Sequence, residues 1–227
     1  RSALISLSNL TDQRMRNAKA GQWWETTPHR KLANNSVCYT EKPDIGIFMD
    51  EWKALYDSKS GERGVFNRVA ARDKVNRSGK RDSDFDFGCN PCSEIILRPY
   101  QFCNLSEVVV RSEDTISSLK KKVRLATIMG TYQSTLTDFK YLRSVWTTNT
   151  EEERLLGVSL TGTSDHEILG HVSSTSRKWL RWLNKVYVDT NLEFSSAIGI
   201  APSAAGTCNK PSGTVSQWVD CASGLHA

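Results

Sequence analysis

Residues 88–103 have the sequence GCNPCSEIILRPYQFC, which places three kinds of reactive side chain within five positions. An amide (Asn90), a thiol (Cys92) and a carboxyl group (Glu94) alternate, and in an extended segment alternate residues project from the same face. Pro91 lacks an N–H and fixes its own φ, so we expect a stiff strand or loop tip rather than a helix. The stretch therefore predicts a rigid element that presents three different groups to one small ligand.

Each of these residues also has a simpler interpretation. A cysteine is often only a small buried hydrophobic residue, and an asparagine often only stabilises a local turn. A glutamate after a turn is often exposed on the surface. The residues alone leave these alternatives open.

Strand-like and helix-like patterns alternate on both sides of this stretch, which indicates an α/β layer fold. Strands are expected at residues 3–7, 33–39 and 155–160. Helices are expected at 50–56, 116–146 (one or two) and 176–198. The charged residues 72–86 are expected to form a mobile loop, and residues 206–219 a turn-rich segment that ends like a strand. The pattern does not distinguish an open sheet from a barrel.

Composition narrows the class of protein. A chain of 227 residues with 38% apolar content can bury a substantial core. No apolar run approaches the ~20 residues of a membrane helix, and no signal peptide is recognisable. Six unevenly spaced cysteines favour a reducing cytoplasm over a secreted disulfide framework. The net charge is +5, and the basic run at 120–124 is typical of a solvated helix face rather than of a nucleic-acid site.

Two neighbouring motifs carry a family resemblance. Asn90–Ile95 (NPCSEI) and Cys103–Glu107 (CNLSE) together resemble the finger-loop region of the ribonucleotide reductases. The short spacing from Cys92 to Cys103 resembles the adenosylcobalamin-dependent class II enzymes more than the iron-dependent class I enzymes, whose interval is longer.

Two further motifs resemble the same family and follow its order along the chain. Lys210–Ser216 (KPSGTVS) resembles the substrate-phosphate loop. Arg1–Leu7 (RSALISL) resembles the strand that leaves the specificity loop, which senses an allosteric nucleotide. The resemblance implies that residues 1–227 are part of a ten-stranded α/β barrel with the finger loop, residues 88–103, threaded through its centre. Family members are several times longer, so we expect an internal fragment; a complete small domain is the alternative.

The resemblance also implies roles for individual residues. Cys92 would become a thiyl radical that takes the 3′ hydrogen of the ribose, and Glu94 would be the general base on the 3′-hydroxyl. Asn90 would hold the ribose hydroxyls. Cys103 would supply reducing equivalents and form a disulfide with a partner that lies upstream of Arg1 in the family.

The phosphate loop is expected to bind through backbone N–H groups and hydroxyls, with Lys210 alongside. Its members are Pro211, Ser212, Gly213, Thr214, Val215 and Ser216. An ordinary Ser/Thr-rich turn would have a similar sequence.

Cys89 departs from the family pattern, because it forms a Cys-x-x-Cys with Cys92. This spacing occurs in zinc sites and thioredoxin-like motifs, but a zinc site would need two more ligands that the sequence does not provide nearby. We expect no metal. Cys38, Cys208 and Cys221 match no redox position and are expected to be structural.

The resemblance implies a cytoplasmic oxidoreductase that converts ribonucleotides to 2′-deoxyribonucleotides with adenosylcobalamin. Its expected partners are the ribonucleotide substrate, an allosteric nucleotide near the N-terminal end and a thioredoxin-like reductant, without nucleic acid or membrane. The alternatives are the large subunit of a class I reductase and a non-catalytic Cys-x-x-Cys metal or binding module.

Overall fold

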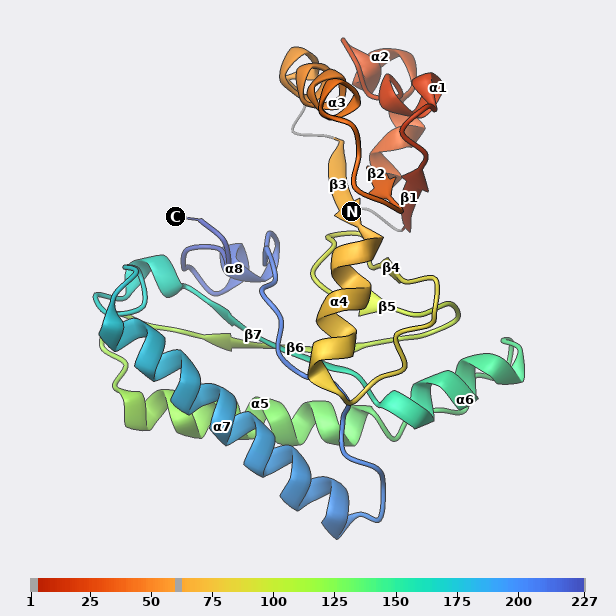
Figure 1. The fold of residues 1–227 in the computed structure, drawn as a ribbon. Coiled ribbons are helices and arrows are strands. Elements are labelled where there is room, and N and C mark those ends of the chain that lie inside the picture. The colour runs from red at the N-terminus through yellow and green to blue at the C-terminus, as the bar shows by residue number, and fades with distance from the viewer. Residues whose placement is uncertain (1–3, 60–62, 227) are drawn as a thin grey trace. The chain divides into compact units, whose positions relative to one another are not determined.

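The computed structural model describes residues 4–59 and 63–226 (Figure 1). The chain divides into two compact units, Arg1–Pro99 and Tyr100–Ala227. Both contain parallel strands connected by helices, so the predicted α/β class is confirmed. Within the described residues, no helix is both long enough and apolar enough to span a membrane.

A three-stranded parallel sheet organises the first unit, in the order β1 (Leu4–Ser8), β2 (Ala33–Tyr39) and β3 (Gly64–Asn67). The central strand β2 coincides with its sequence prediction, and its Val37 and Tyr39 are buried. Of the strand expected at 3–7, residue 3 lies outside the described residues. The connections are α1 (Gln13–Arg16), α2 (Trp23–Thr26), the 3₁₀ helix η1 (Pro28–Leu32) and α3 (Ile45–Ser58).

The expectation of a mobile loop at residues 72–86 is wrong for its first half, where α4 (Arg68–Ser78) lies. The Asn67 side chain caps this helix by accepting a backbone hydrogen bond of 3.0 Å. Ala71 and Val75, one turn apart, are buried in a cluster with Phe66 and Phe87. Two buried apolar positions at helical spacing are therefore enough to pack a predominantly polar helix against the unit.

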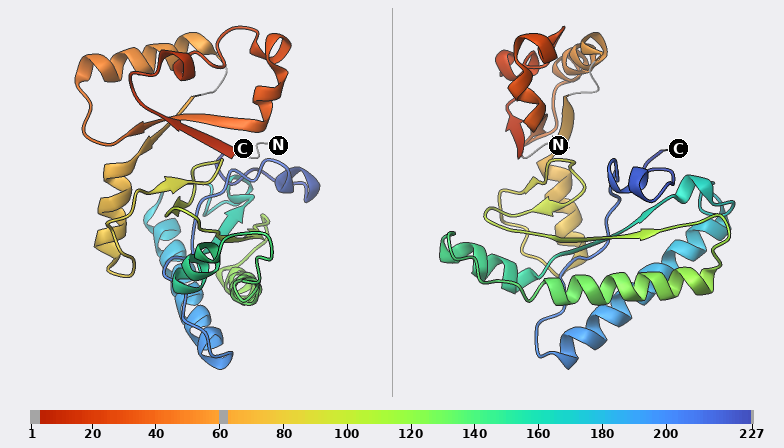
Figure 2. Two further views of the ribbon diagram at one scale, coloured as in Figure 1. Left: turned by 90° about the vertical axis from the view of Figure 1, so that its right-hand side faces the viewer. Right: turned by 180° about the vertical axis from the view of Figure 1, so that it is seen from behind.

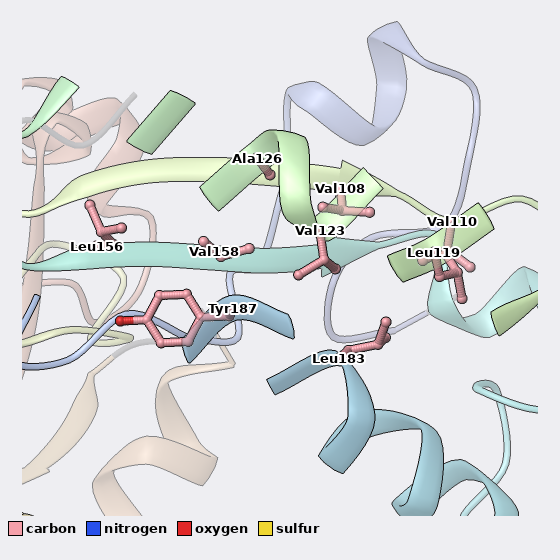
Figure 3. Close-up of a cluster of buried hydrophobic side chains, with 9 residues drawn as sticks. All are labelled: Val108, Val110, Leu119, Val123, Ala126, Leu156, Val158, Leu183 and Tyr187. Atoms are coloured by element: carbon pink, nitrogen blue, oxygen red, sulfur yellow. The ribbon is translucent and has the colours of Figure 1, made fainter. Parts of the chain in front are cut away.

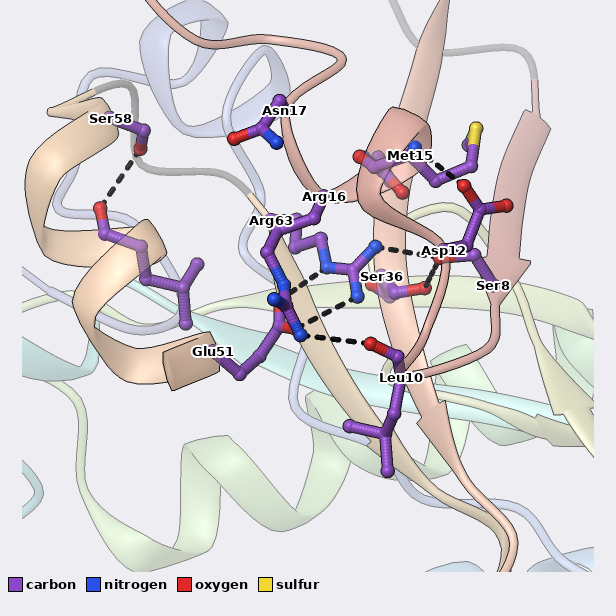
Figure 4. Close-up of polar contacts among 12 residues, drawn as sticks. Ser8, Leu10, Asp12, Met15, Arg16, Asn17, Ser36, Glu51, Ser58 and Arg63 are labelled. Atoms are coloured by element: carbon purple, nitrogen blue, oxygen red, sulfur yellow. Dashed lines mark hydrogen bonds and ion pairs between the residues drawn. The ribbon is translucent and has the colours of Figure 1, made fainter. Parts of the chain in front are cut away.

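Buried ion pairs connect α1, α3 and the start of β3 (Figure 4). Glu51 of α3 has no exposed surface, and its carboxylate receives hydrogen bonds from Arg16 (Nε, 3.0 Å) and Arg63 (Nη2, 3.0 Å). Arg63 also donates to Ser8 Oγ at 2.7 Å. One carboxylate thus holds together three elements that are separate in the sequence.

In the second unit, parallel strands β6 (Asn104–Val109) and β7 (Leu156–Thr161) pair in register, with Glu107 opposite Ser159. A single parallel bridge between Val158 and Thr207 extends the pair. Figures 1 and 2 show two long helices on one side of these strands and α8 on the other. The helices of this unit are α5 (Ile116–Gln133), α6 (Ser144–Glu153), the 3₁₀ helix η2 (Thr163–Asp165), α7 (Ser174–Ala197) and α8 (Val215–Trp218).

The main core lies between the strands and helices α5 and α7 (Figure 3). Alternate strand residues such as Val108 and Val158 meet Leu183 and Tyr187 of α7. The helix expected at residues 176–198 is therefore confirmed as α7. The opposite strand face, which includes Glu107, is free to carry polar groups because successive strand residues point to opposite sides.

The expectation that residues 206–219 end like a strand is wrong. Beyond the bridge at Thr207, Val215–Trp218 form the short helix α8. Ser216 closes its first turn, because both its N–H (3.0 Å) and its hydroxyl (2.6 Å) donate to the carbonyl of Ser212. Local hydrogen bonding by serine thus outweighs the strand propensity of the valines.

Candidate active site

Residues 88–97 form a small hairpin in the first unit, whereas residues 100–103 belong to the second. Strands β4 (Gly88–Cys89) and β5 (Ile96–Leu97) pair antiparallel. Between them, the N–H of Ser93 donates to the carbonyl of Asn90 at 2.9 Å, and Ser93 has a left-handed φ of 62°. The segment is therefore a loop tip, and the alternation of an extended strand is interrupted at Ser93.

Cys92 lies at this tip with its side chain exposed. The neighbouring carbonyl of Pro91 accepts a hydrogen bond from the side chain of Asn34 on β2, which anchors the tip to the sheet. An exposed thiol on an anchored turn differs from a thiol that fills a core. The geometry therefore favours a chemical role for Cys92 over simple packing.

Glu94 follows the tip and is only partly exposed. Its Oε2 is buried and has no hydrogen-bond partner among the described residues. Buried carboxylate oxygens are normally satisfied, so an unsatisfied one beside an exposed thiol is a candidate for contact with a ligand.

Cys89 is part of β4 and lies close enough to the carboxylate of Glu94 to be affected by its charge. Burial raises the pKa of the Cys89 thiol, a weak hydrogen bond with Ser93 Oγ (3.5 Å) lowers it, and the nearby Cys38 and Glu94 raise it further. The Cys89 thiol is consequently less ionised than an ordinary cysteine at neutral pH.

Asn90 has a structural task in the turn. Its Oδ1 accepts the N–H of Ile95 at 3.0 Å, which is the local-turn role that the sequence left open. The amide nitrogen of Asn90 takes no part in this turn contact and is available for the expected contact with a ribose.

Cys103 belongs to the second unit and directly precedes β6. Its neighbour Phe102 packs against Trp146 with ring centroids 4.6 Å apart, and the buried Gln101 donates to Glu153. Tyr187 of α7 has a pKa raised to about 12, mainly by burial and also by Cys103. Cys103 is thus held between an anchored turn and a strand, with a neutral phenol in its surroundings.

The expected phosphate segment begins at Lys210, whose N–H donates to Ser159 Oγ at 2.9 Å. Ser212 has a left-handed φ of 57° and a buried hydroxyl without a partner among the described residues. A Cβ added at Gly213 would meet no atom within 4 Å, so there is open space above the loop. Glu107, which sequence reasoning passed over although it ends the CNLSE motif, forms an ion pair with Lys210 (Nζ to Oε2, 3.2 Å).

The remaining cysteines are reduced and half-buried. Cys208 lines a cavity of about 430 Å³ between α7 and β7, and Cys221 Sγ lies 4.0 Å from Thr161 Oγ1. Among the described residues, no three His, Cys, Asp or Glu side chains gather as a metal site would require. Of the expected effector-linked segment, residues 1–3 lie outside the described residues.

No protein-family model matches the chain. Individual relatives do match over its whole length. The adenosylcobalamin-dependent ribonucleoside-triphosphate reductase of Lacticaseibacillus paracasei is 28% identical over 259 residues, covering 100% of this chain and 33% of the relative. The corresponding enzyme of Lactobacillus leichmannii is 25% identical, again over 100% of this chain and 33% of the relative.

The expected resemblance to the ribonucleotide reductases is confirmed by these relatives. The reductase of Lactobacillus helveticus is 27% identical over 87% of this chain. A crystal structure of a B12-dependent (class II) ribonucleotide reductase matches the fold of 96% of this chain with a TM-score of 0.72 and 22% identity. The chain spans about a third of the length of the curated reductases that it matches.

Proposed function

We propose that the protein containing this chain is a class II ribonucleotide reductase, which reduces ribonucleotides to 2′-deoxyribonucleotides. The observation that carries the proposal is the anchored hairpin tip, where the exposed Cys92 precedes Glu94 with its unsatisfied buried oxygen. The end-to-end similarity to adenosylcobalamin-dependent reductases supports class II over the iron-dependent alternative.

Cys92 and Glu94 have complementary tasks in this chemistry. The sulfur of Cys92, as a thiyl radical, removes the 3′ hydrogen from the ribose and becomes a thiol. Glu94 accepts the 3′-hydroxyl proton, which helps the sugar radical expel its 2′-hydroxyl. When product forms, the Cys92 thiol returns its hydrogen atom to C3′.

Cys103 completes the reduction. Its thiol protonates the departing 2′-hydroxyl, so that water leaves. Cys103 and a second thiol, expected upstream of Arg1, together give two electrons to the sugar and end as a disulfide. A thioredoxin-like dithiol then restores both thiols, which balances the reaction: one ribonucleotide and one dithiol yield one deoxyribonucleotide, one disulfide and one water.

Residues 211–216 hold the substrate phosphates in this proposal, and the amide nitrogen of Asn90 holds the ribose hydroxyls. The N–H groups of Gly213 and Thr214 donate no hydrogen bond within the described part of the chain, which suits an anion receptor.

Adenosylcobalamin supplies the initial radical when it is bound. The exposed position of Cys92 fits this cofactor, because a buried sulfur would be out of reach. We further propose that the chain forms part of a ten-stranded barrel with residues 88–103 as its finger loop. An allosteric nucleotide binds near the N-terminal end in this proposal, and the protein acts in the cytoplasm.

The test is an assay of the full-length protein with radiolabelled ribonucleoside di- and triphosphates, adenosylcobalamin and dithiothreitol. We expect deoxyribonucleotide to form only with the cofactor, and Cys92→Ser to abolish both product and exchange of the cofactor's 5′ hydrogens with solvent. Product without cobalamin would contradict class II, and exchange by the Cys92→Ser variant would contradict the radical role.

A further inference from the structure

The lysine at the entrance of the phosphate loop is held at both ends by one strand pair. Its N–H donates to Ser159 Oγ at 2.9 Å, and its Nζ lies 3.2 Å from Glu107 Oε2. Glu107 and Ser159 are register partners on β6 and β7 and therefore project from the same sheet face. We call the three residues Lys210, Glu107 and Ser159 the loop clamp.

The ion pair of the loop clamp is removed from water. The side chains of Lys210 and Glu107 are 18% and 7% exposed. Ion pairs on a surface contribute little, whereas a charge in a buried pair depends strongly on its partner. The position of Lys210 is thus determined by Glu107 rather than by solvent.

Two polar atoms at this place lack partners among the described residues. One is Glu107 Oε1 and the other is Ser212 Oγ, two residues beyond the clamped lysine. Both side chains are more than nine-tenths buried. The N–H groups of Gly213 and Thr214 likewise donate no hydrogen bond within the described residues. The loop clamp is therefore followed directly along the chain by polar groups without partners, at residues 212–214.

We propose that Glu107 is a positioning residue for the phosphate loop. By holding and neutralising Lys210, it keeps residues 211–216 in the conformation that receives phosphate through backbone N–H groups and hydroxyls. This inference rests on the proposed function and adds that Lys210 acts as an anchor of the loop, not as a free cation for phosphate. β6 starts beside Cys103, so the same strand places the reductant thiol and the phosphate loop.

An arrangement in which Lys210 itself binds phosphate predicts the opposite change in KM. If Lys210 were the phosphate ligand and Glu107 merely competed for it, Glu107→Gln would free the lysine and lower KM. If Glu107 positions the loop, the same variant loosens it and raises KM. The sign of the change in KM therefore separates the two arrangements.

The experiment compares full-length variants in steady-state nucleotide reduction. We expect Glu107→Gln and Lys210→Met each to raise KM about tenfold or more, since small misplacements of binding groups are costly, with kcat within about twofold. Because the two residues act as a unit, the double variant should resemble either single variant. The charge exchange Glu107→Lys with Lys210→Glu should recover part of the loss. Glu167→Gln, at an exposed glutamate of the same unit, is the matched control.

Equilibrium binding of a ribonucleoside triphosphate without cofactor gives a second readout, which does not require turnover. Weaker binding by Glu107→Gln, with unchanged thermal unfolding, supports the proposal. Unchanged or tighter binding overturns it, as does a parallel fall of kcat and stability that the charge exchange does not repair. Absence of reduction by the wild-type protein would instead contradict the proposed function, and the binding comparison would still decide the role of Glu107.

Discussion

Removal of the carboxylate of Glu51 should selectively loosen the sheet of the first unit. Glu51 is completely buried between Arg16 and Arg63, whose side chains are 11% and 2% exposed. Glu51→Ala leaves two guanidinium groups without a counter-charge in a dry site. Breaking a buried pair by removal of one partner costs about 3–5 kcal/mol.

Hydrogen exchange measured by mass spectrometry on the full-length protein reports this cost locally. Peptides from β1, β2 and β3 should exchange faster by roughly two to three and a half orders of magnitude, at about 1.4 kcal/mol per tenfold. Peptides from the core of the second unit, which contains no part of this cluster, should keep their rates. The change in rate therefore converts directly into the free energy of local opening.

Asp57→Ala is the matched control for this prediction, because Asp57 lies on the same helix and pairs with Lys53 in an exposed ion pair. It should leave the exchange rates of the sheet unchanged. If Glu51→Ala also left them unchanged, the buried ion pairs would contribute nothing to the fold of this unit and the reasoning would be refuted. Replacement of all three charged residues by Leu and Met should be milder than Glu51→Ala, since no charge then remains buried alone.

Three further predictions concern single residues. Cys103→Ser should still permit radical formation, seen as cob(II)alamin by stopped-flow absorbance, but should stop multiple turnover; normal turnover would assign the reductant role to another thiol, first Cys89. Iodoacetamide at pH 8 should alkylate the exposed Cys92 before Cys89, whose raised pKa lowers its thiolate fraction, and equal rates by peptide mapping would contradict this. Gly206→Ala should lower the melting temperature of the full-length protein, because the added Cβ would lie 1.8 Å from Tyr187 Oη. An unchanged melting temperature would exclude that close contact. The control is Ala201→Gly, at an exposed position nearby in the sequence.

Local patterns in the sequence were sufficient for much of the fold. Helix α7 and the strand at residues 33–39 follow from residue periodicity, which depends only on neighbours along the chain. The same logic failed at α4, where a charged composition concealed two apolar anchors, and at α8, where serine hydrogen bonds closed a helical turn. The residues of the proposed site are equally local, since Cys92 and Glu94 stand in one short motif.

Tertiary structure alone decided how these groups are supported. The hydrogen bond from Asn34 to Pro91 joins residues 57 positions apart, and the pairing of Glu107 with Lys210 depends on the register of two strands and on where the following segment crosses them. Neither contact has a periodic signal, because side chains distant in sequence meet only after helices and strands have packed. Residue order along the chain thus specifies which reactive groups this protein carries. Packing specifies which neighbours hold them, because burial and charge pairing are properties of the folded chain.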